Sequence, residues 1–318
     1  MAQPNPLARP VILAGLGAAA LGLTALAVSA RARQAERDNP PTGRLIDVDG
    51  VQVHYAELGE GEPLVLLHGN GSMVQDFMSS GFVRQAAKRY RVIAFDRPGY
   101  GYSDRPRSTV WTPAAQAELL RSALQQIEAP RALILGHSWG ASVAIALALA
   151  HPEMVRGLIV ESGYYYASVR GDVVLMSAPA VPVLGDILRY TVSPPLARLL
   201  WPKMIRKLFS PAPVPATFAA VPPEMAIRPS QLRASAAESA LMIPDAVALQ
   251  SRYGELTMPV AIVAGSEDKM VDLDHQALRL HRALPGSFLH VVEGCGHMVH
   301  HTAPHEVMAA VEAVALAA

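Results

Sequence analysis

The sequence predicts an α/β fold in which a mostly parallel sheet is flanked by helices. Short apolar runs alternate with helical stretches along residues 45–162, and the alternation returns along residues 259–317. Several runs, such as Pro63 to Leu67, are apolar throughout, as strands covered on both faces are. Residues 163–254 interrupt the alternation with dense prolines and no buried strand. Because strand–helix alternation places parallel strands between two helical layers, we expect one such core with a helical insertion.

The bulk composition excludes several classes of protein. The 318 residues carry 27 basic and 27 acidic side chains, so the formal net charge is zero and no basic field for nucleic acid is expected. The single cysteine, Cys295, excludes an internal disulfide framework and a cysteine-built zinc site. We expect no cofactor and no metal, and the composition gives no oligomeric state.

The N-terminus is apolar enough to reach a membrane. Residues 11–30 contain no charge, and about 20 such residues cross a bilayer as one helix. We expect residues 1–38 to hold an uncleaved single-pass anchor, with the rest of the chain on the cytoplasmic side because Arg31, Arg33 and Arg37 follow the run. The alternative is a signal peptide cleaved near Ala30, which would give a secreted or periplasmic protein.

The remaining elements follow in chain order. Residues 39–43 are a linker, and residues 45–49 and 51–57 alternate around Asp49-Gly50, which favours a hairpin with a two-residue turn. Thr112 and Pro113 are typical of a helix start. We expect core strands at 63–67, 91–95, 133–135, 157–161, 259–264 and 287–292, and core helices at 77–89, 112–129, 141–150, 273–284 and 304–317.

One pentapeptide in this core indicates chemistry. Gly136-His137-Ser138-Trp139-Gly140 fits the pattern G-x-S-x-G and lies between a buried strand and the apolar helix 141–150. A serine on so sharp a turn is strained, and glycine, which lacks a Cβ, fits the flanking positions. The turn lifts the serine Oγ above the sheet and aims the Trp139 N–H at a developing oxyanion. In this context the chain resembles the α/β-hydrolase family over about residues 45–318.

The resemblance implies a catalytic triad in the chain order serine, acid, histidine. Asp268 follows the strand at 259–264, and His297 follows the strand at 287–292 through a glycine-containing turn. Ser138 is then the nucleophile, His297 the general base and later the acid, and Asp268 the orienting carboxylate. Glu161 is the competing acid, because some members place it after that earlier strand. His137 is expected to turn back under the nucleophile in a structural role.

The resemblance also implies an oxyanion hole and a cap. The hole would use the backbone N–H groups of Trp139 and Asn70, the latter in the loop after His68-Gly69. Residues 39–162 and 255–318 would form the core, and residues 163–254 a helical cap with pieces at 183–190 and 196–209. Residues 96–104 match a family loop and are expected to be a structural turn. A metal site built from His297, His300, His301 and His305 is an alternative with no matching acidic or cysteine ligand set.

The nucleophile decides the reaction class. His68-Gly69-Asn70 with a tryptophan after the nucleophile resembles haloalkane dehalogenases, which use aspartate where this chain has Ser138. A serine that attacked an alkyl carbon would form an ether with no carbonyl for water to attack, so turnover would stop. A serine triad therefore predicts acyl transfer.

We expect a carboxylic-ester hydrolase acting on a small hydrophobic ester, because the cap is apolar and the chain is expected at a membrane. The same triad also serves C–C bond hydrolases, perhydrolases of the haloperoxidase type, hydroxynitrile lyases and proline aminopeptidases. An aminopeptidase needs acids to bind the substrate ammonium, and the cap offers few: Glu224, Glu238 and Asp245. In another class, a non-catalytic receptor or scaffold remains an alternative, although such members usually have a broken triad.

Overall fold

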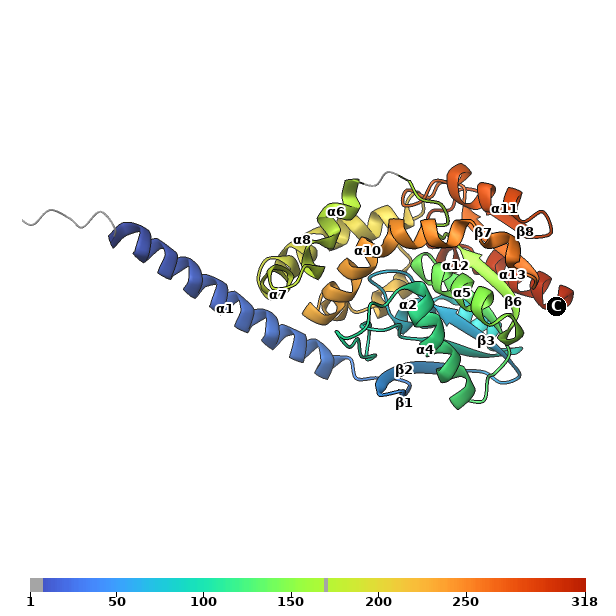
Figure 1. The fold of residues 1–318 in the computed structure, drawn as a ribbon, viewed down its shortest axis with the longest axis horizontal. Coiled ribbons are helices and arrows are strands. Elements are labelled where there is room, and N and C mark those ends of the chain that lie inside the picture. Colours follow the sequence, from blue (N-terminus) through green and yellow to red (C-terminus); the bar gives the residue numbers. More distant parts are fainter. Residues whose placement is uncertain (1–7, 169–170) are drawn as a thin grey trace, which may run out of the picture.

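The computed structural model describes residues 8–168 and 171–318, and an eight-stranded sheet forms the centre of its globular part (Figure 1). The strand order is β1-β2-β4-β3-β5-β6-β7-β8. The first two strands pair antiparallel with their neighbours, and all the others run parallel, which confirms the mostly parallel sheet. The strands are β1 Arg44–Val48, β2 Val51–Leu58, β3 Glu62–Leu67, β4 Tyr90–Phe95, β5 Ala132–His137, β6 Val155–Glu161, β7 Val260–Gly265 and β8 Phe288–Val292.

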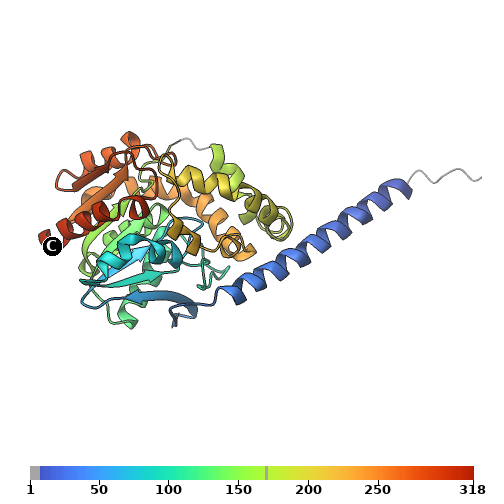
Figure 2. The ribbon, with the colours of Figure 1, turned by 180° about the vertical axis from the view of Figure 1, so that it is seen from behind.

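Helices cover both faces of this sheet, as Figure 2 shows from behind. The central strand β3 alternates between the two layers: Val65 and Leu67 belong to one core cluster, and Leu64 and Leu66 to the other. All four side chains are buried. The first layer contains α4 Pro113–Gln126, α5 Trp139–Ala150 and α11 Arg279–Ala283; the second contains α2 Val74–Ser79, α3 Gly81–Ala86, α12 Val299–Thr302 and α13 Pro304–Ala317.

Local sequence signals account for several boundaries. Asp49 and Gly50 both have positive φ, 54° and 80°, which confirms the two-residue hairpin turn between β1 and β2. The Thr112 side chain accepts a hydrogen bond from the Ala115 N–H at 3.2 Å, and Pro113 begins α4 as expected.

Two expected helices differ from the structure. The helix expected at 77–89 is two short helices, α2 and α3, separated at Ser80, whose backbone is extended and whose Oγ donates to Phe77 O at 2.6 Å. The serine hydroxyl competes for the helix carbonyl, and Gly81 follows it, so a break is favoured there. The helix expected at 273–284 begins as a π-helical turn, Asp274–Leu278, and continues as α11.

The chain between β6 and β7 is helical, and no strand lies there among the described residues. The α-helices are α6 Gly171–Ser177, α7 Leu184–Tyr190, α8 Ser193–Phe209, α9 Pro223–Ala226 and α10 Pro229–Gln250, with 3₁₀ turns at Ala178–Ala180, Ala216–Ala220 and Tyr253–Glu255. We call this part of the chain the cap. Its longest helix, α10, continues through Pro244. Because proline usually ends a helix, the sequence predicts only shorter helical pieces between the prolines.

A long helix, α1 Ala8–Asp38, projects from the end of the molecule at which the cap lies, and the C-terminus lies at the other end (Figures 1 and 2). Its segment Gly15–Asp38 is long and apolar enough to cross a membrane, and 6 % of the tested window is buried. A membrane anchor and a signal sequence both fit this helix. Its last turns contact the globular part: Glu36 pairs with Arg228 at 2.7 Å, and Ala35 is buried against Met73 and Met225.

Candidate active site

Ser138 lies at the turn between β5 and α5. Its φ and ψ are 54° and −119°, outside the regions that side-chain-bearing residues favour, and its N–H donates to Glu161 O at 2.8 Å. A Cβ on Gly136 would meet the Gly140 carbonyl, and one on Gly140 would meet the Leu67 carbonyl. The two glycines are therefore required by the close packing of the turn, and the serine is held in a strained conformation of the kind found at nucleophile turns.

His297 and Asp268 meet above the ends of β7 and β8. His297 Nδ1 lies 2.7 Å from Asp268 Oδ2, and Asp268 Oδ1 accepts the N–H groups of Met270 at 2.7 Å and Val271 at 3.2 Å. Burial would raise the pKa of Asp268, but His297 and these N–H groups outweigh it and hold the pKa below its usual range. The acid therefore stays ionised and orients the His297 ring through Nδ1.

The expected oxyanion hole joins two loops. Neither the Asn70 N–H nor the Trp139 N–H has a carbonyl partner among the loop and turn hydrogen bonds of the described residues. The Asn70 side chain, in contrast, is committed: its amide donates to Ser235 O at 3.1 Å and Ser239 Oγ at 3.2 Å, both on α10. Asn70 is thus available through its main chain, and its side chain ties the loop to the cap. The roles of Ser138, Asp268, His297, Asn70 and Trp139 stay predictions.

A buried ionic cluster joins the core to the cap beside this loop. Arg97, which follows β4, forms a two-pronged ion pair with Glu238 of α10, and the Arg97 Nη2–Glu238 Oε2 distance is 3.0 Å. Glu238 also accepts hydrogen bonds from the Tyr100 hydroxyl at 2.7 Å and from Gln116 Nε2 at 3.1 Å. Burial would lower the pKa of Arg97, but the Glu238 charge outweighs it and raises the pKa. We call Arg97, Tyr100, Gln116 and Glu238 the cap cluster.

Arg97 also holds the oxyanion loop. Its Nε donates to His68 O at 2.7 Å, and its Nη2 donates to Gly69 O at 3.0 Å. A trans peptide points its C=O and N–H in opposite directions. Fixing the Gly69 carbonyl against Arg97 therefore turns the Asn70 N–H away from the arginine. Burial and the Arg97 charge lower the pKa of His68 to about 4, so this histidine stays neutral beside the loop.

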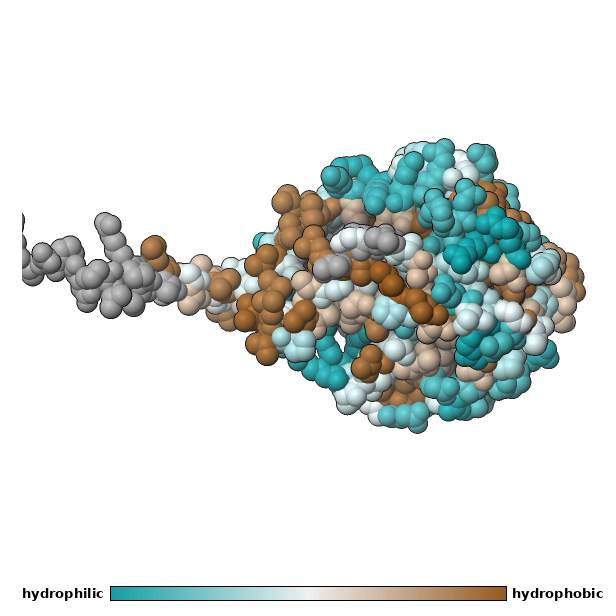
Figure 3. All heavy atoms as spheres, turned by 45° about the horizontal axis from the view of Figure 1, so that its top comes forward, coloured by the Kyte–Doolittle hydropathy of each residue, from teal (hydrophilic) through white to brown (hydrophobic). Residues whose placement is uncertain are grey.

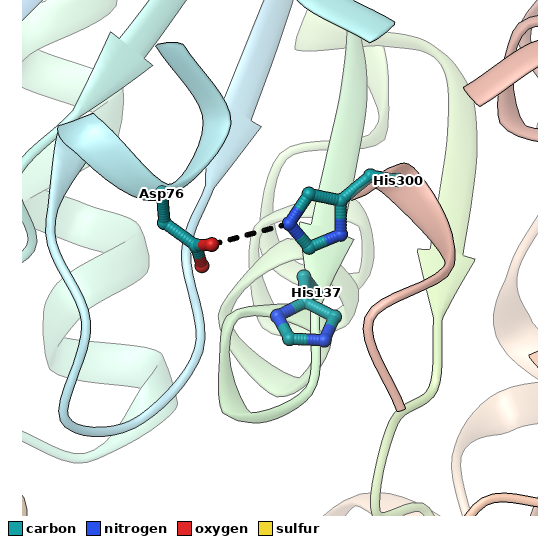
Figure 4. Close-up of side chains that lie close together, drawn as sticks. All are labelled: Asp76, His137 and His300. Atoms are coloured by element: carbon teal, nitrogen blue, oxygen red, sulfur yellow. Dashed lines mark hydrogen bonds and ion pairs between the residues drawn. The ribbon is translucent and has the colours of Figure 1, made fainter. Parts of the chain in front are cut away.

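A second buried cluster lies under the nucleophile turn. His300 Nδ1 is 2.7 Å from Glu161 Oε1, and His300 Nε2 is 3.3 Å from Asp76 Oδ1; Figure 4 shows Asp76 and His300 pointing toward each other, with His137 beside them. Burial alone would lower the pKa of His300, but the two carboxylates outweigh it and raise the pKa to about 10. We call Asp76, Glu161 and His300 the turn cluster.

Two residues here, Glu161 in the turn cluster and His137 packed beside it, are ones for which the sequence predicts alternative or structural roles. Glu161 bonds to His300 and not to His297, so Asp268 is the acid that contacts the expected catalytic histidine. His137 is buried under the turn, with Nε2 3.1 Å from His297 O and its ring packed against the His300 ring, and burial lowers its pKa to about 3.

The histidines do not gather as a metal site of the expected composition. His297 pairs with Asp268, and exposed His305 lies beside Glu306. His300 and His301, in contrast, both contact Asp76, at 3.3 and 2.9 Å. Asp76, His137 and His300 do place one ligand atom each within 4.8 Å of one another. Both His300 nitrogens, however, already face carboxylates, and its raised pKa favours the charged ring, which cannot ligate a metal. An ion-paired imidazolium explains this group.

Sequence reasoning missed the cap cluster. It treated residues 96–104 as a structural turn and Glu238 as an acid that could bind a substrate ammonium. A single acid in the Ala-rich stretch of α10 was a signal that Glu238 is buried, but its partner lies 141 positions away in the sequence. The pairing depends on how the cap folds back over the core, which no local pattern encodes.

A family model described as the alpha/beta hydrolase fold matches residues 62–304. The chain belongs to the α/β-hydrolase family. The 2-hydroxymuconate semialdehyde hydrolase of Pseudomonas sp. (strain CF600) is 29% identical over 273 residues, which cover 83% of this chain and 90% of that protein. A 2-hydroxy-6-oxononadienedioate/2-hydroxy-6-oxononatrienedioate hydrolase 2 of Pseudomonas putida is 31% identical over 255 residues, covering 78% of this chain and 85% of the relative.

Solved structures agree on the fold of this α/β hydrolase. A bacterial membrane phospholipase A has a TM-score of 0.65 at 22% identity, covering 97% of this chain and 98% of that chain. A meta-cleavage product hydrolase from Pseudomonas fluorescens IP01 has a TM-score of 0.63 at 23% identity, covering 86% and 98%. The protein is a hydrolase of this fold, and the named relatives do not confirm the ester preference that its composition predicted.

Proposed function

We propose that this α/β hydrolase cleaves a carbon–carbon bond next to a carbonyl group through Ser138, His297 and Asp268. The observation that carries the proposal is that relatives which share 28–31% identity over most of the chain are named as hydrolases of 2-hydroxy-6-oxo dienoates and of 2-hydroxymuconate semialdehyde. The 2.7 Å His297–Asp268 bond and the strained turn at Ser138 are compatible with such a reaction, and no hydrogen bond joins Ser138 Oγ to His297 among the described residues.

The chemistry balances with these groups. His297 takes the proton of the nucleophile as oxygen adds to the substrate ketone, and the N–H groups of Asn70 and Trp139 stabilise the oxyanion. For a 2-hydroxy dienoate the proton of the 2-hydroxyl has first moved to the carbon next to the ketone, so that position 2 is a carbonyl. The carbon–carbon bond then breaks, and its electron pair is delocalised as an enolate conjugated with that distant carbonyl. The imidazolium returns the proton to the enolate. Water hydrolyses the acyl-enzyme, so the products are a carboxylic acid and a shortened enol or ketone.

The charge near the oxyanion loop is compatible with an acidic substrate. Two guanidinium groups, of Arg97 and Arg105, lie near one carboxylate, Glu238, and the Arg105–Glu238 distance is 3.8 Å. Burial, helped by the Glu238 charge, raises the pKa of Asp245 to about 7, so this neighbouring acid is only partly ionised at neutral pH. The surplus positive charge favours a carboxylate-bearing substrate. An ammonium substrate, which the proline aminopeptidase alternative requires, would find Glu224 and Glu238 already paired with arginines.

The test compares two substrate classes on the full-length chain in detergent. Ring-opened 2-hydroxy-6-oxo-2,4-dienoates absorb strongly through their conjugated enolate, so cleavage is followed as loss of absorbance. p-Nitrophenyl esters of increasing chain length report ester hydrolysis. We expect the dienoates to be the better substrates by kcat/KM, and Ser138→Ala and His297→Ala to lower kcat by about 10³ or more.

The matched control is His305→Ala, because His305 is exposed and lies outside the triad. It should leave the rate unchanged. If Ser138→Ala keeps wild-type kcat, the proposed nucleophile is wrong. If the esters are turned over and the dienoates are not, the substrate class is wrong while the triad stands.

A hydrophobic carboxylic ester is the second candidate substrate. One observation favours it: the apolar helix α1 lies against the cap, whose α7 and α8 expose large apolar side chains. A chain-length optimum among long acyl esters, with no dienoate cleavage, would support this candidate.

A further inference from the structure

The cap exposes an unusual apolar surface for a folded domain. Large apolar side chains of α7, α8 and the turn before α7 face outward, and Val183 and Leu199 are 73% and 76% exposed. Figure 3 shows apolar residues gathered at the end of the globular part from which α1 projects. A contiguous exposed apolar surface marks an interaction site. We define the apolar cap face by Val183, Leu184, Ile187, Leu196, Leu199 and Leu200.

Helix α1 is fixed next to this face. It contacts α7, α9 and α10, and its residues from Val28 onward carry the contact, since Val28 and Ala35 are buried. The Glu36–Arg228 ion pair of 2.7 Å holds the end of α1, and the Tyr102 hydroxyl donates to Asn39 O at 2.5 Å just beyond it. The direction of α1 is therefore tied to the cap.

The position of the contact along α1 sets the level of the cap relative to a membrane. The apolar run ends at about residue 30, and its exposed side chains include Leu13, Leu16, Leu21, Leu23 and Leu26. About 20 helical residues span roughly 30 Å, the thickness of the hydrocarbon layer. The cap meets α1 where this run ends and the arginines begin, which is the level of the lipid headgroups.

The charges on α8 are of one sign, whereas the one acid of α7, Asp186, is paired with Arg107 and Arg189. Helix α8, Ser193–Phe209, contains Arg198, Lys203, Arg206 and Lys207 and no acidic residue. Arg198 pairs with Glu224, whereas the other three are exposed and have no acidic partner among the described residues. Apolar side chains next to clustered basic residues are the pattern of a helix that lies in the interface of a bilayer with anionic lipids.

We propose that the apolar cap face docks into the headgroup region of an anionic phospholipid bilayer that α1 crosses. The apolar cap face includes residues of α7, which contacts α1, and of α8, which carries the basic residues. The same helix reaches the candidate active site, because Leu208 O near its end accepts the His297 N–H at 3.0 Å. The bilayer therefore contacts an element that supports the loop carrying His297.

The test measures where the cap lies relative to lipid in the full-length chain. A Leu199→Cys variant is labelled with an environment-sensitive dye and reconstituted into vesicles of phosphatidylcholine and phosphatidylglycerol. The native Cys295 is buried, and the unsubstituted chain reports any labelling there. The matched control is Leu316→Cys, because Leu316 is 89% exposed at the end of the molecule away from α1.

We expect a spin-labelled lipid with its label near the headgroups to quench the dye at position 199 by more than about half, and the dye at position 316 by less than about a tenth. Lys203→Glu combined with Arg206→Glu should weaken the quenching in anionic vesicles and leave it unchanged in purely zwitterionic vesicles.

Three outcomes would overturn the proposal. The dye at position 199 could stay as exposed to water in vesicles as the dye at position 316. It could instead be shielded in detergent without lipid and become exposed on dilution, in which case a second copy of the chain covers the face. Mass spectrometry of the chain purified from membranes could show cleavage near Ala30, which would remove the segment expected to cross the bilayer.

Discussion

The two buried ionic clusters beside Ser138 differ in the parts of the chain that they join. The turn cluster lies within the core, because Asp76, Glu161 and His300 come from α2, β6 and α12. The cap cluster crosses between core and cap, because Arg97, Tyr100 and Gln116 come from the core and Glu238 comes from α10. Loss of the first should therefore lower the stability of the core. Loss of the second should change the position of the oxyanion loop and the cap.

The largest effect is expected from breaking the turn cluster with His300→Gln. The substitution leaves the Glu161 carboxylate buried without its cation and leaves Asp76 with His301, 2.9 Å away, as its remaining basic partner. Breaking a buried ion pair by removing one partner lowers the free energy of unfolding by about 3–5 kcal/mol. Denaturant unfolding of the full-length chain in detergent measures it.

His305→Gln is the control, since His305 is exposed and the same substitution there removes no buried charge. Adding Glu161→Gln to His300→Gln should recover part of the lost stability, because one unpaired carboxylate is removed. Equal stability of His300→Gln and His305→Gln would show that the turn cluster is not an ion pair.

The same cluster predicts a slope of stability with pH. The pKa of His300 is raised to about 10 in the folded chain, against about 6.5 when unfolded. Its contribution is fully present below pH 6.5 and is lost as the pH rises toward 10. The free energy of unfolding should therefore fall by about 1.4 kcal/mol per pH unit between pH 7 and 9.

The carboxylates of the turn cluster act on the acid side. His300 and its neighbours hold the pKa values of Asp76 and Glu161 below their usual range against the effect of burial, so their contribution is lost as the pH falls below about 4. The free energy of unfolding, measured at a series of pH values, tests both the acid and the alkaline side of this profile. In His300→Gln the slope between pH 7 and 9 should disappear, and a slope that persists would assign it to another group.

Breaking the cap cluster should be detected first as a loss of activity. In Glu238→Gln the one amide oxygen can replace only one of the two carboxylate oxygens, which accept separately from Tyr100 and Gln116. Arg97 also loses its counter-charge and holds the carbonyls of His68 and Gly69 less firmly. A misplacement of the oxyanion loop by about 1 Å lowers the rate by about 10². We expect kcat to fall by that factor, with a smaller change in KM.

Glu224→Gln provides the matched control for Glu238→Gln. Glu224 is a partly exposed cap acid that pairs with Arg198 and makes no hydrogen bond to the oxyanion loop among the described residues. It should keep kcat within about twofold, because exposed ion pairs contribute little. A loss of kcat in Glu224→Gln equal to that in Glu238→Gln would mean that the cap in general, and not the Arg97 contact, supports the reaction.

The contrast between the clusters also shows what the sequence could reveal. The α/β fold follows from periodicity and from glycine chemistry at Ser138, because buried parallel strands and a tight nucleophile turn leave local patterns. The expected order of Ser138, Asp268 and His297 came from the family resemblance, in which each residue follows a strand, and their roles stay predictions. Neither ionic cluster was readable, because Arg97 with Glu238 and His300 with Asp76 meet only after distant segments pack.

Asp245 gives the test with the smallest expected effect. It is a cap acid without a cationic partner among the described residues, whereas the acids of the turn cluster contact the His300 imidazolium. Its Oδ2 is buried without a hydrogen-bond partner among the described residues, and burial together with the Glu238 charge raises its pKa to about 7. A carboxyl whose folded pKa is raised destabilises the protein progressively as the pH rises from about 4 to 7, and the full penalty remains above 7.

Asp245→Asn should therefore raise the free energy of unfolding at pH 8 by on the order of 1 kcal/mol after allowance for solvent screening, and change it little at pH 4. Asp104→Asn, at an exposed carboxylate, is the control and should change nothing at either pH. An equal gain in the free energy of unfolding at pH 4 and pH 8 would show that the Asp245 carboxyl is neutral at both pH values and that its charge does not destabilise the cap.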